Sequence, residues 1–199
     1  QAEDGIRDSS VTGVQTCALP ISISIGGDNM RNYQPGKTIE ISPGKFIPSY
    51  SIIPPENVKC FPEYLRMNGY YCTNSPKEDY QFEAPVTAWD ESSGKAHWKN
   101  RPEGKPFFAV FNLDVTHESQ IWKRDSLPLL VSPDSVSVPG YYPDIPEIRR
   151  NIARQLSNVI EMDRQAGVLI QQLKDAGLYE NSYIFFYSDH GDGLPYVKR

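Results

Sequence analysis

Two aspartates and a histidine follow a short apolar run close to the end of the sequence. The run spans residues 183–187, and it is followed by Asp189, His190 and Asp192, with glycines among them. Consecutive β-prone residues of this kind predict a strand that is buried on both faces of a sheet. Ligands of open α/β sheets bind outside the carboxyl ends of the strands, so oxygen and nitrogen ligands here suit a divalent cation. The alternative is a polar turn that closes the strand.

A second apolar run, residues 106–113, ends in the same way. The residues that follow it are of types that bind ligands, namely Asp114, Thr116, His117, Glu118 and Ser119. If both runs are parallel strands of one sheet, their carboxyl ends lie at the same edge. We therefore predict that His117 shares one cleft with Asp189 and His190. Glu118 either orients His117 or faces solvent.

The segment between the two runs has the periodicity of a long helix. Apolar residues recur at helical spacing, first at Ile148, Ile152, Leu156, Val159 and Ile160 and then at Ala166, Leu169, Ile170 and Leu173. Pro146 suits the first turn of this helix, and Gly177 suits the position just after its last turn. Strand, helix and strand in this order imply a right-handed parallel crossover, so we predict an α/β fold with a mostly parallel sheet.

The composition is that of an ordinary globular protein, and it excludes two classes of partner. With 199 residues, 39% of them hydrophobic, the chain is long enough for one sizeable α/β core. The formal net charge of -5 gives no electrostatic reason to bind nucleic acid. No apolar run approaches the length of a membrane span.

The cysteines do not have the spacing of a metal site. Cys60 and Cys72 either form a disulfide or are buried thiols, and we favour buried thiols. The redox state of the compartment in which the protein works is therefore left open.

The first residues do not resemble the start of a domain. Residues 9–21 are similar to the translation of a common short-read sequencing adapter. We therefore expect residues 1–22 to be a non-native segment and residues 23–199 to be a partial domain. The sequence begins without a secretory pattern and ends a few residues after Asp189, so we expect an internal fragment of a longer protein.

Four motifs in order resemble the sulfatase family of the alkaline-phosphatase-like superfamily. Residues 181–191 are similar to the strand end that binds the metal, and residues 106–112 with 116–119 are similar to the central strand and the active-site histidine. Motifs within residues 160–178 and 60–74 resemble the helix before the metal-binding strand and an earlier helix and strand of bacterial sulfatases. The resemblance implies a mostly parallel sheet with helices on both faces, present here as an incomplete domain.

The resemblance also implies an activity and a set of site residues. The family hydrolyses sulfate esters or sulfamates at a calcium (Ca²⁺) site, which implies a sulfated carbohydrate or an aryl sulfate as substrate. By position, Asp189 and His190 correspond to metal ligands, and His117 corresponds to a catalytic residue that contacts the sulfate or protonates the leaving group. An imidazole at position 190 also suits another divalent ion, or the sulfate itself. The sulfate-binding basic residues correspond to Lys77, to Lys198 and to its competitor Arg199.

The sequence departs from the family pattern at the nucleophile. The family uses a formylglycine made from Cys or Ser in a Cys/Ser-x-Pro/Ala-x-Arg motif. Pro20 lies one place too late after Cys17, and Tyr64 replaces the arginine after Cys60. The early aspartate pair that completes the calcium site of the family is missing as well. We therefore expect this sequence to hold half of a metal site and to turn over no substrate by itself.

Two further segments leave alternatives open. Lys77 matches only the lysine of the Gly-Lys-x-His segment of many sulfatases, because Asp79 replaces the histidine, so Lys77 either contacts sulfate or lies on a surface loop. Residues 89–92 and 95–98 combine tryptophans with polar side chains, a mixture that suits sugar recognition. We favour the alternative, in which the two tryptophans anchor a loop to the core.

Two other functions remain as alternatives to a sulfatase. One is a phosphodiesterase or phosphonate hydrolase of the same superfamily, which would use an unmodified Thr or Ser nucleophile. The other is a non-catalytic protein that binds a sulfated glycan or a metal. The resemblance implies a periplasmic or extracellular location, and the sequence leaves the oligomeric state open.

Overall fold

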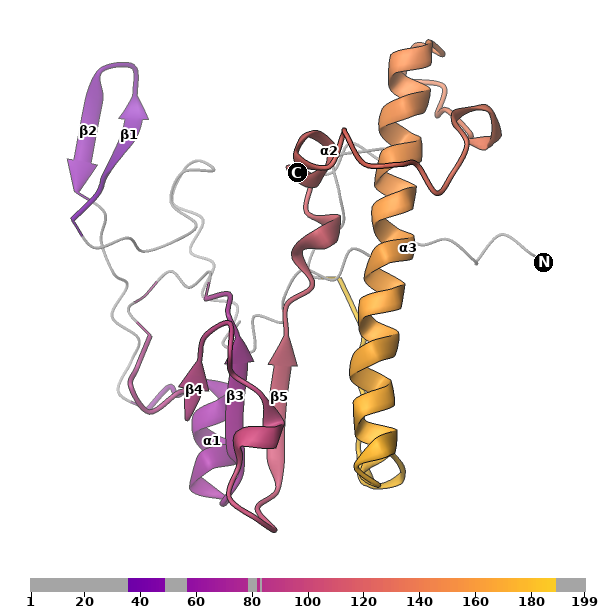
Figure 1. Cartoon of the computed structure of the whole chain (residues 1–199). Helices are drawn as coiled ribbons and strands as arrows, with labels where there is room; N and C mark the ends of the chain where they lie inside the picture. Colours follow the sequence, from indigo (N-terminus) through magenta and orange to yellow (C-terminus); the bar gives the residue numbers. More distant parts are fainter. Residues whose placement is uncertain (1–35, 49–56, 79–81, 83, 189–199) are drawn as a thin grey trace. The chain divides into compact units, whose positions relative to one another are not determined.

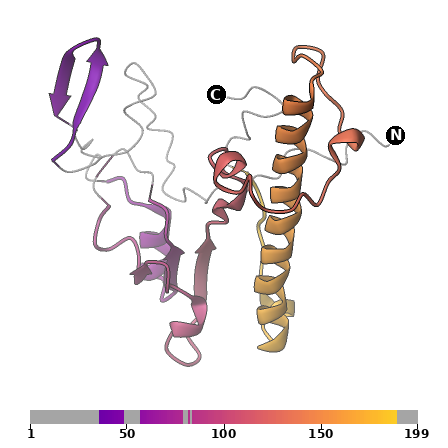
Figure 2. The ribbon, with the colours of Figure 1, turned by 45° about the horizontal axis from the view of Figure 1, so that its top comes forward.

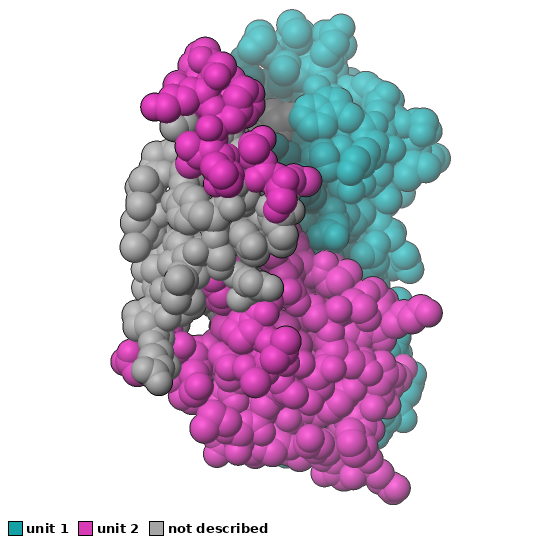
Figure 3. All heavy atoms as spheres, turned by 90° about the vertical axis from the view of Figure 1, so that its left-hand side faces the viewer, with its two compact units in different colours: residues 1–14, 113–199 teal, residues 15–112 magenta. Residues whose placement is uncertain are grey.

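The computed structural model describes residues 36–48, 57–78, 82 and 84–188. Two compact units divide the chain, one of residues 15–112 and the other of residues 1–14 with 113–199 (Figure 3). A parallel sheet organises the unit of residues 15–112, and one long helix organises the other unit (Figure 1).

The unit of residues 15–112 contains a three-stranded sheet in which all neighbours are parallel. The strand order is β4 (Glu91–Ser92), β3 (Tyr71–Ser75), β5 (Phe107–Phe111), and β3 and β5 lie side by side in Figures 1 and 2. Helix α1 (Phe61–Met67) packs against β3. The strand predicted in residues 106–113 is confirmed, and so is the α/β class with a parallel sheet and helices.

A separate antiparallel hairpin precedes α1 in the chain. It consists of β1 (Thr38–Ser42) and β2 (Lys45–Pro48). Gly44 occupies the turn with a φ of 75°, which only glycine adopts without strain. The Glu40 carboxylate accepts a hydrogen bond of 2.8 Å from the Gly44 N–H and so closes the turn.

Aromatic side chains cover both faces of the parallel sheet. Phe107 and Phe108 are consecutive in β5, so their side chains point to opposite faces. Phe108 contacts Phe61 of α1 edge-on at 5.4 Å between ring centroids and stacks on Trp89 at 6.1 Å. On the other face, Trp98 stacks on Phe107 at 5.5 Å. Trp89 and Trp98 are both buried, which confirms that the two tryptophans anchor their loop to the core.

Cys60 and Cys72 are both buried thiols, as predicted. The Sγ atom of Cys72 lies 3.7 Å from the carbonyl oxygen of Pro62. Burial raises the pKa of the Cys72 thiol to about 12, because the charged thiolate loses its solvation in the core. Cys72 therefore packs as a small apolar residue and is not a reactive nucleophile.

The unit that contains residues 113–199 is organised along helix α3 (Pro146–Asp175). Pro146 lies in the first turn, where its missing N–H costs no hydrogen bond. The helix ends in a Schellman motif, in which the N–H groups of Gly177 and Leu178 each donate to a carbonyl of the last turns at 2.9 Å. The predicted start and end of this helix are confirmed. In the described part of the chain, neither α3 nor any other helix is long and apolar enough to span a membrane.

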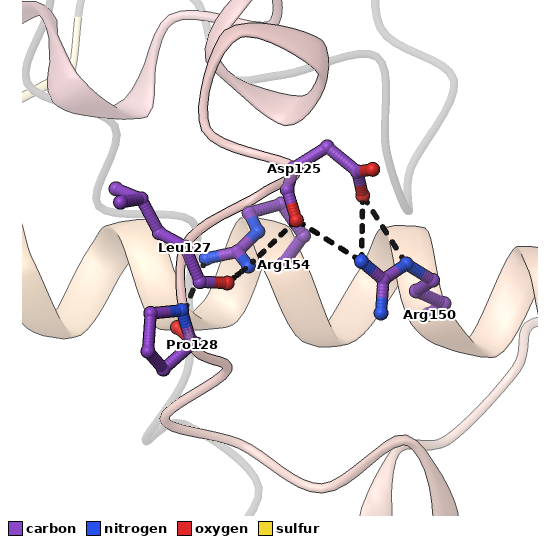
Figure 4. A network of polar contacts seen from close by, with 5 residues as sticks. All are labelled: Asp125, Leu127, Pro128, Arg150 and Arg154. Atoms are coloured by element: carbon purple, nitrogen blue, oxygen red, sulfur yellow. Dashed lines mark hydrogen bonds and ion pairs between the residues drawn. The ribbon is translucent and has the colours of Figure 1, made fainter.

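An arginine network holds an irregular segment against α3 (Figure 4). Arg154 is buried and donates hydrogen bonds to the carbonyl groups of Leu127 and Pro128. Arg150, one turn earlier, donates to the Asp125 carboxylate at 2.9 Å and to the Asp125 carbonyl at 3.0 Å. Because a guanidinium offers five N–H donors in a fixed plane, two arginines satisfy several loop carbonyls at once.

The structure does not form the strand predicted at residues 183–187. Within the described residues, the segment 182–188 is in neither a helix nor a strand, and the exposed fractions are 95% for Tyr183 and 78% for Phe185. A strand needs a neighbour that pairs with its N–H and C=O groups, and apolar composition alone does not supply one. The prediction of a buried strand here is wrong, and so is the strand–helix–strand crossover that depended on it.

Gly177 and Gly167 offer a matched test of how α3 ends. Replacing Gly177 with Ala is expected to lower the free energy of unfolding by about 1 kcal/mol, because a Cβ is strained at this left-handed position. Replacing Gly167, which is exposed inside α3, with Ala is expected to raise it by about 0.5–1 kcal/mol through helix propensity. Urea denaturation measures both changes, and two changes of the same sign would contradict the capping assignment.

Candidate functional site

Two short helices fix the main chain of His117. The residue follows the 3-10 helix η3 (Asp114–Thr116) directly, and its N–H donates to the Asp114 carbonyl at 3.1 Å. Its own carbonyl accepts a hydrogen bond of 2.8 Å from the N–H of Gln120, which begins α2 (Gln120–Lys123). Both backbone groups of His117 are therefore bonded, and the residue is held in a defined turn.

One apolar and one polar contact anchor η3 to α3. Val115 packs against Met162 of α3, and both side chains are buried. The Nε2 atom of Gln155, also on α3, donates to the Thr116 carbonyl at 3.0 Å. A buried carbonyl is costly to leave unpaired, so this bond fixes the chain immediately before His117.

The His117 imidazole is exposed, and one of its two nitrogens is already bonded. Nδ1 accepts a hydrogen bond of 3.2 Å from the Ser119 backbone N–H and lies 2.9 Å from Ser119 Oγ. Since a backbone N–H can only donate, Nδ1 carries a lone pair, and the proton of the neutral ring is on Nε2. The ring therefore presents an N–H donor on the side opposite Ser119, which suits an anionic oxygen or the oxygen of a leaving group.

The contact that orients His117 comes from Ser119, whereas Glu118 is exposed to solvent. On sequence alone, Ser119 is only one of several possible ligands. The sequence contained one signal for this contact, namely that Ser119 lies two residues after His117. A side chain that accepts a hydrogen bond from the main-chain N–H two residues further on is a common turn feature.

Lys77 lies just beyond β3 in the other unit, where a buried asparagine holds its main chain. Asn74 is 0% exposed, and its Nδ2 donates to the Lys77 carbonyl and to Ser92 Oγ, both at 3.1 Å. Its Oδ1 accepts a hydrogen bond of 3.0 Å from Nδ2 of Asn112, which directly follows β5. These bonds join the carboxyl ends of three parallel strands, so Lys77 is held at the edge of the sheet where ligands of α/β proteins bind.

The same edge presents acceptor groups close to this lysine segment. Asn112 Nδ2 also donates to the Ser75 carbonyl at 2.6 Å, while its Oδ1 is buried without a hydrogen-bond partner among the described residues. Ser92 Oγ is bonded to the Glu78 carboxylate. A buried acceptor without a partner costs free energy, so Asn112 is held in place by the two bonds of its Nδ2 and not by its Oδ1.

The sequence-predicted site residues fall in different parts of the chain. Lys77 lies in the unit of residues 15–112, and His117 lies in the other unit. The remaining candidates lie outside the described residues, namely Asp189, His190, Lys198 and Arg199. A cleft that His117 shares with the two metal-ligand candidates therefore stays a prediction. Within the described ranges, no group of three or more His, Cys, Asp or Glu side chains is placed to hold a metal ion.

Comparison with known proteins gives a consistent family assignment. The family model described as Sulfatase matches residues 70–198. The chain is 41% identical to an "Ulvan-active sulfatase" of Formosa agariphila in an alignment that is 230 positions long and covers 98% of the chain. It is also 35% identical to the "N-sulphoglucosamine sulphohydrolase" of Homo sapiens over 71 residues, or 36% of the chain. No solved structure matches the chain significantly.

The chain is much shorter than these relatives. It spans 37% of the length of the Formosa agariphila protein and 14% of the length of the human protein. The matched part includes Lys77, His117, Asp189, His190 and Lys198.

Replacing Asn74 with Asp tests whether this amide holds the Lys77 segment. The change keeps the shape of the side chain but puts an acceptor where Nδ2 now donates to two oxygens, so we expect a loss of about 1–3 kcal/mol in the free energy of unfolding. Asn68→Asp is the matched control, because Asn68 also donates to a carbonyl but is exposed, and its effect should stay within about 0.5 kcal/mol. Equal effects in urea denaturation would contradict the role of Asn74.

Proposed function

The chain belongs to the sulfatase family, and we propose that it is part of an enzyme that hydrolyses a sulfate ester or a sulfamate on a sugar. The observation that carries this proposal is the 41% identity to a sulfatase over 98% of the chain. The names of the two relatives specify ulvan and N-sulphoglucosamine, which supports a sulfated carbohydrate over an aryl sulfate as the substrate class.

His117 is proposed to act through its Nε2–H. With Nδ1 bonded to Ser119, the neutral ring has one donor left, and that donor is on the side of the ring opposite Ser119. A donor in this position can bond a sulfate oxygen in the ground state and, by hydrogen bonding, stabilise the negative charge that develops on the leaving oxygen of the sugar. The fixed main chain of His117 reduces the reorganisation that this step would otherwise require.

Lys77 is proposed to bind the charge of the sulfate group. An ammonium group is a compact cation that pairs with an anionic oxygen, and Asn74 holds the main chain that carries it.

Asp189 and His190 are proposed to hold a divalent cation, and Lys198 or Arg199 is proposed to contact the sulfate. These four residues lie outside the described residues, so their roles rest on the sequence motif. The carboxylate of Asp189 suits Ca²⁺, whereas an imidazole ligand favours another divalent ion or binds the sulfate. When bound, such a cation would polarise the sulfate oxygens.

The nucleophile is proposed to come from a part of the enzyme that this sequence does not contain. The formylglycine motif of the family has no match here. After Cys17 the proline comes one place too late, and after Cys60 the proline is present but Tyr64 replaces the arginine. Cys60 is in addition a buried thiol at the start of α1. We therefore expect no turnover from the 199 residues by themselves.

Calcium binding tests the metal assignment without any need for turnover. In an enzyme that carries this sequence together with the missing metal ligands, isothermal titration with Ca²⁺ should show binding that weakens at least about tenfold in Asp189→Ala, because one ligand is lost. Asp192→Ala is the matched control, because the family resemblance assigns the metal ligands to Asp189 and His190 and not to Asp192, and this variant should bind Ca²⁺ as the wild type does. Equal binding by the wild type and the Asp189 variant would overturn the metal assignment.

Turnover tests the function in an enzyme that carries this sequence together with its nucleophile. His117→Ala should lower kcat for a sulfated sugar by about 10²–10³, the usual cost of losing one donor that stabilises the developing charge. Glu118→Gln is the control at the next, exposed position and should leave kcat within about twofold. Hydrolysis of phosphate esters in place of sulfate esters would favour the phosphodiesterase alternative, and unchanged kcat in the His117 variant would remove its catalytic role.

A further inference from the structure

We propose that Ser119 is a positioning residue that fixes the ring orientation and the tautomer of His117. Its hydroxyl and its backbone N–H both face Nδ1, so the exposed Nε2 keeps the proton of the neutral ring. This inference rests on the proposed function for its catalytic meaning, but the geometry itself does not depend on it.

The two contacts to Nδ1 are compatible with only one tautomer. The backbone nitrogen of Ser119 lies 3.2 Å from Nδ1, and a backbone N–H group can act only as a hydrogen-bond donor. If Nδ1 carried a hydrogen, two N–H groups would face each other. Nδ1 is therefore an acceptor, and the Ser119 hydroxyl, at 2.9 Å, donates into the same lone pair.

Helix capping does not account for the position of the Ser119 side chain. Ser119 directly precedes α2, and a serine there normally accepts a hydrogen bond from an N–H of the first turn. Here the side chain makes no capping hydrogen bond, and the backbone has helical angles, with φ of -59° and ψ of -18°. The hydroxyl is directed to His117 instead of to the helix.

His97 shows what the hydroxyl adds. Its Nδ1 accepts a hydrogen bond of 3.1 Å from the Lys99 N–H, at the same two-residue spacing, but residue 99 has no hydroxyl. The ring of His97 is held by aromatic neighbours, with centroid distances of 5.1 Å to Trp98 and 5.2 Å to Phe111. The His117 ring is exposed, so we infer that the Ser119 hydroxyl restrains this ring, as aromatic packing restrains the ring of His97.

Loss of the Ser119 hydroxyl is expected to slow the chemical step of the reaction, which kcat measures. Without it, the exposed ring can rotate and exchange the places of its two nitrogens, so that Nε2–H is no longer always directed outward. A misdirected donor weakens interactions that are strongest in the transition state, and supporting residues of this kind are worth about 10–100-fold. In an enzyme that carries this sequence with its nucleophile, Ser119→Ala should therefore lower kcat by about tenfold, with little change in KM.

The direct test is NMR of the 199-residue chain labelled with ¹⁵N and ¹³C in its histidines, at pH about 9, where histidine side chains are neutral. The wild type should show His117 as the Nε2–H tautomer with a hydrogen-bonded Nδ1. Ser119→Ala should shift the Nδ1 resonance towards that of an unbonded imine nitrogen and introduce the second tautomer. Ser119→Thr, which keeps the hydroxyl, should restore the wild-type signals.

Two controls separate positioning from general loss of structure. The His97 signals should stay unchanged in every Ser119 variant. Ser132→Ala removes a hydroxyl that caps the N–H of Asp134 in the same unit, and it should leave His117 unchanged. If His117 gave the same NMR signals in Ser119→Ala as in the wild type, the inference would be overturned, even if the variant also had a lower kcat. The expected NMR change, together with no sulfatase activity in an enzyme that carries this sequence with its nucleophile, would support the positioning and refute the proposed function.

Discussion

Hydrogen bonds from buried side-chain amides to loop carbonyls are the interaction on which both described site residues depend. Asn74 bonds the Lys77 carbonyl at 3.1 Å, and Gln155 bonds the Thr116 carbonyl, next to His117, at 3.0 Å. Each donor stands on a regular element, β3 or α3, whose own backbone is already paired. Since a buried carbonyl left unpaired costs about 1–3 kcal/mol, each loop is held to its element and each site residue is held with it.

This arrangement separates the support of the site from its chemistry. The buried amides fix main chain, while the His117 ring is exposed, as its proposed contact with a substrate requires. Ser119 then selects which ring nitrogen is presented, through contacts of 2.9 and 3.2 Å to Nδ1. Preorganised donors of this kind are what charge stabilisation in a transition state requires, because they need no rearrangement when the charge develops.

Sequence reasoning succeeded where local pattern decides the outcome. The apolar period, Pro146 and Gly177 predicted the full length of α3, and the run after Pro106 predicted β5. The same kind of reasoning failed at residues 183–187, where an equally apolar run forms no strand in the structure. Helical hydrogen bonds lie within the segment, whereas a strand depends on a partner that its own residues cannot specify.

The sequence by itself determined the sulfatase family, the elements α3 and β5, and the candidates His117 and Lys77, because motifs and periodicity are local properties of the chain. Only the tertiary structure decided what holds these candidates. The bond from Asn112 to Asn74 joins residues 38 positions apart, and the bond from Gln155 to Thr116 joins residues 39 positions apart. Such pairs form only when β5 lies beside β3 and α3 lies beside η3. The order of residues along the chain does not specify which distant elements become neighbours in space.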